Sequence, residues 1–166
     1  MYQTGDLVVY GSHGVCRVCG TEIRVIDRKT VSYYVLEPNE QSSARFYVPS
    51  ENQVALAKMR PLMSKQELLA LLASEEIRNA SFIVDEHRRK SCYRELISSC
   101  DCRALLQMVH TLVRHKDECA ASGRKFHLCD ENFLRDAQRI LSAEFSVVLQ
   151  IPPAEVPAFV QRAMYQ

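Results

Sequence analysis

The sequence contains no tryptophan among its 166 residues, only five glycines, and almost no net charge, with 21 Lys and Arg residues against 20 Asp and Glu residues. The scarcity of glycine and the 47% hydrophobic content exclude a disordered or low-complexity chain and indicate a soluble globular protein of one or two domains. The balanced charge excludes a polycation, so any binding to nucleic acid has to depend on a local basic patch.

The sequence also lacks an apolar run whose length approaches the roughly 20 residues that a membrane span requires. Its first residues do not show the basic segment followed by an apolar segment that is typical of a secretion signal. We therefore expect a cytoplasmic protein without a membrane partner. Its cysteines number seven, and an odd number in this compartment favours free thiols over a disulfide framework.

The most specific stretch is residues 4–18, TGDLVVYGSHGVCRV, in which two β-rich runs flank a polar corner and predict a β-hairpin. Similar runs continue to about residue 60, and Gly20 inside the long second run predicts a strongly bent strand. Strands are expected at residues 7–10, 15–26, 31–36, 45–48 and 56–60. This spacing predicts a small SH3/Tudor-like antiparallel β-barrel.

After Pro61 the hydrophobic pattern changes to a helical period, beginning with a capping box at Ser64 and Glu67. Further helices are expected to be capped by Asp85, Asp101 and Asp130, with a last short helix at residues 154–164. The sequence thus predicts an α+β protein with a β-barrel domain at residues 1–62 and a compact α-helical bundle at residues 63–166.

Two groups of cysteine and histidine residues could carry metal or redox chemistry. Cys16 and Cys19 have C-x-x-C spacing, but residues three apart on a regular strand point to opposite faces, and no second ligand pair accompanies them. A second group, near a loop, has no characteristic spacing; it comprises His115, Cys119, His127 and Cys129. We interpret the thiols as small hydrophobic residues and predict no metal, no cofactor, no small-molecule substrate and no catalysis. A cysteine-based metal or redox protein remains an alternative.

A basic run begins the second predicted helix. Its cations are Arg88, Arg89, Lys90 and Arg94. Lys90 and Arg94 lie one turn apart and away from the apolar stripe, whereas Arg89 falls on the stripe side and must snorkel or lie beyond the edge of the core. Two interpretations stay open: a solvated helix face, or a surface that contacts nucleic-acid phosphates.

An ordered set of motifs resembles the CarD/CdnL family of bacterial regulators that bind RNA polymerase. The likeness covers nearly the whole chain, and the order and spacing of the set are more specific than any single piece. The motifs are Gly5–Tyr10, His13–Val15, Tyr33–Leu36, Val48–Pro49 with Asn52, Met59–Leu62, Arg88–Arg89, Leu96–Asp101 and Gln138–Glu144.

The resemblance implies a transcription regulator whose Tudor-like domain docks on the β subunit of RNA polymerase. It also implies that the helical domain contacts promoter DNA and stabilises the open complex by differential binding. Arg24 and Tyr47 match polymerase-contacting positions of the family. The expected docking face comprises Arg24, Arg45, Phe46 and Tyr47, not all of which can face the partner because side chains alternate along a strand.

By the same resemblance, Arg88 and Arg89 match the family's DNA-contacting pair. The predicted DNA-binding residues are Arg88, Arg89, Lys90, Arg94, Arg124 and Lys125. Several members carry a tryptophan two residues before the arginine pair, where this sequence has Glu86, and a basic position before the last long helix falls at Glu131. Since a carboxylate repels phosphates, the alternative is a polymerase-binding adaptor, or a divergent paralogue, without DNA contact.

Overall fold

The computed structural model describes residues 1–39 and 43–165, which form two compact units. The first unit, Met1–Leu62, holds the β-strands, and the second, Met63–Gln166, holds the long helices. We refer to them as the sheet domain and the helical domain. The predicted α+β class is confirmed, with an antiparallel sheet followed by helices.

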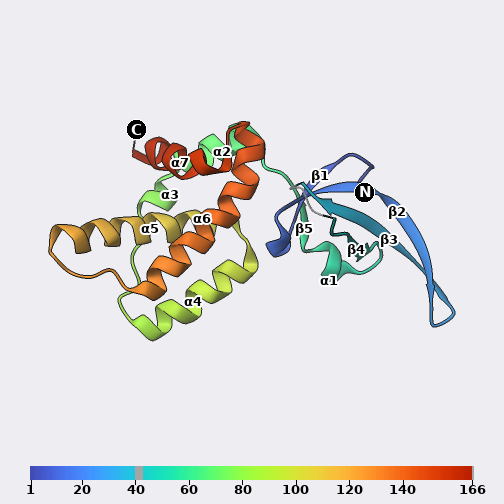
Figure 1. The fold of residues 1–166 in the computed structure, drawn as a ribbon, viewed down its shortest axis with the longest axis horizontal. Coiled ribbons are helices and arrows are strands. Elements are labelled where there is room, and N and C mark those ends of the chain that lie inside the picture. Colours follow the sequence, from blue (N-terminus) through green and yellow to red (C-terminus); the bar gives the residue numbers. More distant parts are fainter. Residues whose placement is uncertain (40–42, 166) are drawn as a thin grey trace. The chain divides into compact units, whose positions relative to one another are not determined.

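The described residues of the sheet domain form a five-stranded antiparallel sheet in the order β4-β3-β2-β1-β5 (Figure 1). Val8 of β1 lies opposite Cys16 of β2, which confirms the hairpin predicted in residues 4–18. The strands are β1 (Leu7–Tyr10), β2 (Val15–Ile26), β3 (Lys29–Pro38), β4 (Phe46–Pro49) and β5 (Met59–Pro61).

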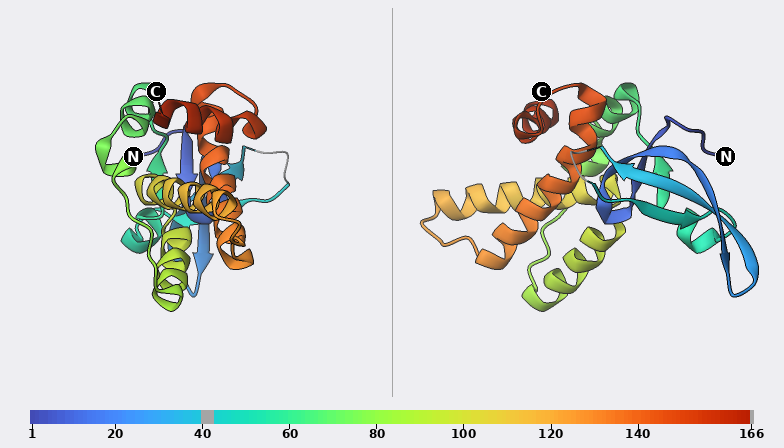
Figure 2. Two further views of the ribbon diagram at one scale, coloured as in Figure 1. Left: turned by 90° about the vertical axis from the view of Figure 1, so that its left-hand side faces the viewer. Right: turned by 45° about the vertical axis from the view of Figure 1, so that its right-hand side comes forward.

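The long strand β2 changes register against β3 between Val18 and Gly20, where the sequence predicts a bend. Gly20 has a φ of +151°, a backbone conformation that residues with a Cβ rarely adopt. The limit is the backbone and not the space, because a Cβ at this position would make an ordinary van der Waals contact of 3.7 Å with Thr4 Oγ1. Beyond the bend, β2 and β3 continue as a hairpin arm that extends past the other strands to a turn at Asp27 and Arg28 (Figure 2).

The fifth strand is shorter than predicted, because it begins at Met59 instead of Leu56. The Asn52 side chain accepts hydrogen bonds from the backbone N–H groups of Val54 and Ala55, and so caps a one-turn helix, α1 (Gln53–Leu56). Leu56 ends this turn and Ala57 is its C-cap, so the chain enters the sheet only at Met59.

The helical domain contains six α-helices in its described residues, 63–165. Ser64 and Glu67 form the predicted capping box, and the Asp85 and Asp101 carboxylates cap α4 and α5 as predicted. No helix in the described part of the chain is long and apolar enough to cross a membrane. The helices are α2 (Lys65–Leu72), α3 (Glu75–Arg78), α4 (Glu86–Ser99), α5 (Cys102–Ala121), α6 (Leu128–Leu149) and α7 (Val156–Tyr165).

The prediction that Asp130 caps the fourth long helix is wrong. Helix α6 begins at Leu128, and its N-cap residue, His127, lies three residues before Asp130 and makes no side-chain capping bond. Asp130 lies in the first turn and is fully buried, because an arginine of α4 binds its carboxylate. The Asp130 carboxylate therefore binds a side chain of another helix instead of the backbone N–H groups at the start of its own helix.

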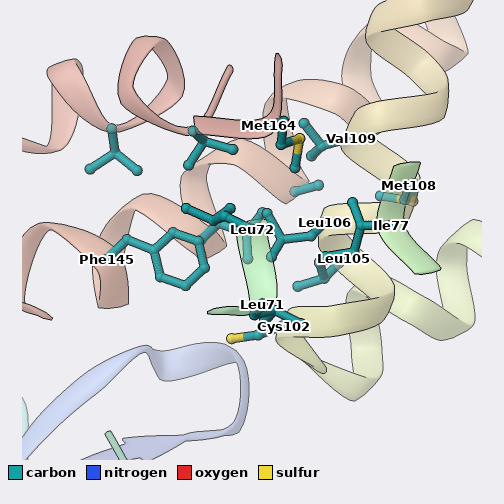
Figure 3. Packing of buried hydrophobic residues seen from close by; sticks show 14 of the residues in the cluster. Leu71, Leu72, Ile77, Cys102, Leu105, Leu106, Met108, Val109, Phe145 and Met164 are labelled. Atoms are coloured by element: carbon teal, nitrogen blue, oxygen red, sulfur yellow. The ribbon is translucent and has the colours of Figure 1, made fainter. Parts of the chain in front are cut away.

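The core of the helical domain takes side chains from each of the helices α2 to α7, including Ile77 of α3 (Figure 3). Leu72, Leu105 and Phe145 are fully inaccessible to solvent, and Met164 of the last helix packs into the same cluster. In the described part of the sheet domain, a separate core lies on the inner face of the strands, and its buried side chains are Val8, Cys16, Val18, Tyr34, Leu36, Val48 and Met59. Each domain thus has its own hydrophobic core.

Candidate functional site

One face of the sheet domain carries an arginine stacked on a tyrosine. The Arg24 guanidinium lies 3.9 Å from the centre of the Tyr47 ring, and Arg24 Nε donates a 2.8 Å hydrogen bond to Glu22 Oε1. The Tyr33 ring meets the Tyr47 ring edge-on, with centroids 6.5 Å apart. This cluster on β2, β3 and β4 holds Arg24 in a fixed place, with its side chain still 42% exposed.

Arg45 extends the same face. Its Nε donates a 2.8 Å hydrogen bond to Oε1 of Glu37. Glu37 lies two residues along β3 from Val35, which pairs with Tyr47, so Glu37 and Tyr47 lie on the same side of the sheet. Its side chain is 60% exposed. We call the surface formed by Glu22, Arg24, Tyr33, Glu37, Arg45 and Tyr47 the outer face. Sequence reasoning missed Tyr33 and the two glutamates, which only the strand register brings beside the arginines.

Phe46 does not belong to the outer face. It lies opposite Leu36, which is completely buried, and so points to the inner side of the sheet. There it packs with Tyr10 and with His13, whose ring centroid is 4.2 Å away. We therefore remove Phe46 from the predicted docking residues, because the alternation of side chains along β4 separates it from Tyr47.

The hairpin arm of β2 and β3 exposes apolar side chains to solvent. The sequence pattern predicted a strand at these positions but did not indicate that their side chains would be exposed. Ile23 is 69% exposed and Val25 is 73% exposed. They alternate with Arg24, so they lie on the opposite face of the arm from the outer face. This part of β2 extends beyond the core that would otherwise cover them.

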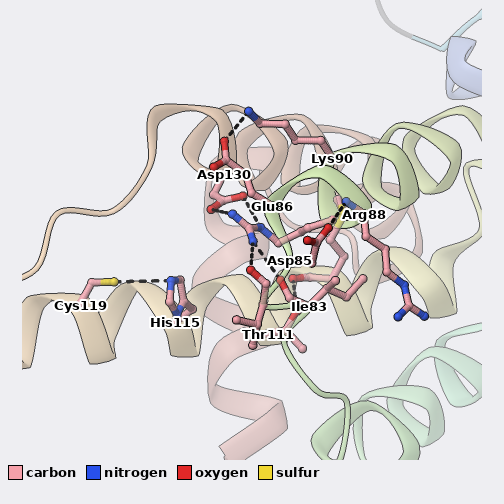
Figure 4. Close-up of polar contacts among 12 residues, drawn as sticks. Ile83, Asp85, Glu86, Arg88, Lys90, Thr111, His115, Cys119 and Asp130 are labelled. Carbon is pink, nitrogen blue, oxygen red and sulfur yellow. Dashed lines mark hydrogen bonds and ion pairs between the residues drawn. The ribbon is translucent and has the colours of Figure 1, made fainter.

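Helix α4 presents some of its predicted cations to solvent. Arg88 and Arg94 are exposed, and Arg88 points away from the carboxylate of Asp130 (Figure 4). Lys90 is half-buried and forms an ion pair with Glu86, one turn earlier on the same helix. That pairing holds the pKa of Glu86 below its usual range, so Glu86 neutralises part of the basic surface.

Arg89 lies inside the helical domain instead of at the edge of its core. Its side chain is 4% exposed, and Nε and Nη2 donate hydrogen bonds of 2.9 Å to the two carboxylate oxygens of Asp130. Nη1 donates to the carbonyl oxygens of Ile83 and Val84, at 2.9 and 3.2 Å. The guanidinium also lies 4.7 Å from the centre of the Phe82 ring. Its donors are used within the fold, so we remove Arg89 from the predicted DNA contacts.

Arg124 and Lys125 lie exposed in the loop between α5 and α6. The Arg124 backbone N–H donates to the carbonyl of Cys119, and its Nε donates to Ser122 Oγ at 2.9 Å. The loop leads into the first turn of α6, which Arg89 binds through Asp130. These two cations therefore lie just before the N-terminal end of α6, which α4 contacts through Arg89.

The structure separates the two groups of cysteine and histidine residues, with Cys16 and Cys19 in the sheet domain and the second group in the helical domain. Burial raises the pKa of Cys16 to about 11, and burial together with Glu37 raises the pKa of Cys19, so neither thiol is poised as the thiolate that metal binding or redox exchange requires. Cys119 is buried with its Sγ 3.6 Å from His115 Nε2, whereas His127 and Cys129 lie at the start of α6. Within residues 1–39 and 43–165, no group of three or more His, Cys, Asp or Glu residues is placed to hold a metal ion.

The structure thus defines the class as a two-domain protein, in which a small antiparallel sheet domain with an exposed arginine–tyrosine face is joined to a helical domain. Residues 2–63 match the family described as CarD-like/TRCF RID domain, so the sheet domain belongs to this family. It is a family of RNA polymerase-interacting domains that occur in non-catalytic regulators. No curated protein matches the chain.

Proposed function

We propose that this protein is a transcription regulator that binds the β subunit of RNA polymerase through the outer face of its sheet domain. The observation that carries the proposal is the match of residues 2–63 to a polymerase-interacting domain family. The outer face suits such a role, because the Tyr47 ring and Glu22 hold the Arg24 guanidinium before binding, which lowers the entropy lost on docking.

Each outer-face arginine has a glutamate beside it, so the face alternates in charge. A partner strand or loop with both signs of charge would find complementary groups there, and such complementarity gives specificity and register more than affinity. Arg24, Arg45 and Tyr47 are the proposed docking residues.

Co-purification of the full chain with the polymerase β subunit tests this half of the proposal. Arg24→Glu should abolish or strongly weaken capture, since it removes the cation over Tyr47 and places a second carboxylate beside Glu22. Lys58→Glu makes the same charge change at an exposed position outside the outer face and serves as the matched control. Equal capture of the two variants would refute the docking face.

We further propose that the helical domain stabilises the promoter open complex in the cytoplasm through phosphate contacts by exposed cations. The proposed contacts are Arg88, Lys90, Arg94, Arg124 and Lys125. Binding the melted promoter more tightly than the closed one would shift the equilibrium between them by the difference in affinity.

A second candidate function is a polymerase-bound adaptor that leaves DNA untouched. It is favoured by the ion pair of Glu86 with Lys90 and by the burial of Arg89, which together leave α4 with fewer free cations than its sequence suggests. A promoter footprint made with polymerase separates the two candidates. Arg88→Ala/Arg94→Ala should shorten the protected region, whereas Arg139→Ala/Arg162→Ala, which removes two exposed cations of α6 and α7, should not. Identical footprints for all proteins would favour the adaptor.

A further inference from the structure

The helical domain contains a polar pocket that neither the sequence motifs nor the proposed contacts of α4 explain. It has a volume of about 380 Å³ and lies between α5 and the segment that follows α3. Arg78, Asn79 and Ser81 line one side, and Arg114 and His115 of α5 line the other, with Glu118 also in the lining. All of these residues belong to one domain, so the pocket does not depend on how the two domains are placed.

The two arginines of this pocket have no charged partner among the residues that the structure describes. Arg78 and Arg114 are both exposed, and in residues 1–39 and 43–165 neither guanidinium forms an ion pair or a hydrogen bond. Arg103, on the same pair of helices, is in contrast neutralised by Glu76. Two uncompensated cations thus approach one hollow from two different elements.

The pocket adjoins a buried histidine of α5, His110, whose Nε2 lies 3.1 Å from the Arg78 carbonyl oxygen. Burial lowers the pKa of His110, and the positive charges of Arg114 and Arg78 lower that pKa further. The hydrogen bond from His110 Nε2 to the Arg78 carbonyl oxygen acts in the opposite direction and raises it. The arginines therefore act electrostatically on a buried group beside them. Glu118 is the only carboxylate in the described lining, and it lies 3.9 Å from His115 Nδ1.

One wall of the pocket is held by stacking. The rings of Phe82 and His115 are nearly parallel, 15° apart, with centroids separated by 3.9 Å. The Arg89 guanidinium, which Asp130 holds in place, lies 4.7 Å from the centre of the same Phe82 ring. His115 Nε2 lies 3.6 Å from Cys119 Sγ (Figure 4). The hollow is accordingly preformed, as a small-ligand site requires.

We propose that this pocket binds a phosphate group. Guanidinium groups match the oxygens of a phosphate with paired donors, and the Asn79 amide and Ser81 hydroxyl supply neutral donors at the same wall. The volume accommodates a phosphate with part of the group that carries it. The phosphate can belong either to a nucleic-acid backbone or to a free phosphate ester, and the experiment below distinguishes these sources.

Titration of the isotopically labelled full chain with inorganic phosphate, followed by amide NMR at constant ionic strength, tests the site. Saturable shifts are expected for the amides of residues 78–82 and 114. Arg78→Gln/Arg114→Gln should weaken binding by about tenfold or more, the effect expected for loss of charge-assisted hydrogen bonds. Arg103→Gln, which removes an arginine already paired with Glu76, should leave the affinity unchanged, and Glu118→Gln should increase it.

Two further probes identify the source of the phosphate. If it is a nucleic-acid backbone, Arg78→Gln/Arg114→Gln should reduce the salt dependence of binding to a labelled duplex by a slope of about 1.8. If it is a free ester, a nucleoside monophosphate should bind more tightly than inorganic phosphate and the duplex slope should not change. Shifts that chloride reproduces, or equal phosphate affinity in the double variant, would overturn the site. Such a failure would leave polymerase capture and the footprint unaffected, since neither involves these residues.

Discussion

Replacement of Arg89 by alanine is the most informative single perturbation of the helical domain. The change removes five donors from a site where Asp130 is completely buried and where the carbonyls of Ile83 and Val84 accept two of the hydrogen bonds. It leaves the Asp130 carboxylate without a counter-charge in a place that water does not reach. The substitution therefore tests whether the ion pair forms in solution as it does in the structure.

The expected loss of stability is large. Removing one partner of a buried ion pair costs about 3–5 kcal/mol, chiefly because the remaining charge stays buried and unpaired. A domain of about 100 residues loses roughly 4–8 °C in melting temperature per kcal/mol, so Arg89→Ala should lower the Tm of the helical domain by more than about 10 °C. Arg88→Ala, at the exposed neighbouring position, should change stability by less than about 0.5 kcal/mol.

Urea and thermal unfolding of the full chain, followed by circular dichroism at the helical band, provide the measurement, since the long helices lie in one domain. Arg89→Lys should recover only part of the loss, because an ammonium group cannot bind both carboxylate oxygens in the planar geometry of arginine. Arg89→Met/Asp130→Leu should be more stable than either single variant, as expected when both charges are removed together.

An Arg89→Ala variant as stable as Arg88→Ala would refute this reasoning. It would mean that the contacts with Asp130 are not formed in solution, and Arg89 would then be free to contact phosphates beside Arg88. The stability measurement thus also decides whether Arg89 belongs to the proposed DNA surface.

Three further predictions concern helix ends and pH. Ser64→Ala should cost about 0.5–2 kcal/mol in urea unfolding, because it breaks the capping box of α2, and an unchanged midpoint would contradict the cap. Gln150→Gly should stabilise the chain by about 0.5–1 kcal/mol, since residue 150 is exposed and has a left-handed φ of 57°, whereas Gln150→Ala should give no gain. Burial lowers the pKa of His110 below 6.5, so the unfolded chain binds the His110 proton more tightly than the folded chain does. The free energy of unfolding should therefore be full above about pH 6.5 and fall as the pH drops below it. His110→Gln should flatten this pH dependence, and an unchanged slope in the variant would argue against His110 as its source.

Much of the fold could be predicted from local sequence signals. The hairpin of residues 4–18 and the caps at Ser64, Asp85 and Asp101 depend on residues a few positions apart, and the structure confirms all of them. The errors occurred where a local motif had a distant competitor. Asp130 resembled an N-cap but binds an arginine 41 residues away.

The candidate surfaces were less predictable because they depend on register and on packing between elements. Strand alternation indicated that the four docking candidates could not all share a face, but only the pairing of Leu36 with Phe46 shows that Phe46 is the one turned inward. The pocket of Arg78 and Arg114 joins two helices through residues with no motif in common. No spacing rule links residues 36 positions apart that meet through tertiary structure.

The cysteine side chains give each domain a built-in reporter of its own opening. Cys16 is completely inaccessible in the core of the sheet domain, and Cys100, Cys102 and Cys119 are buried in the helical domain. A thiol reagent can modify these positions only after local or global unfolding, so peptide-resolved modification rates measure the opening free energy of the two domains separately in one unlabelled sample. Domain-by-domain stabilisation by polymerase or by DNA could then be read without introducing a probe.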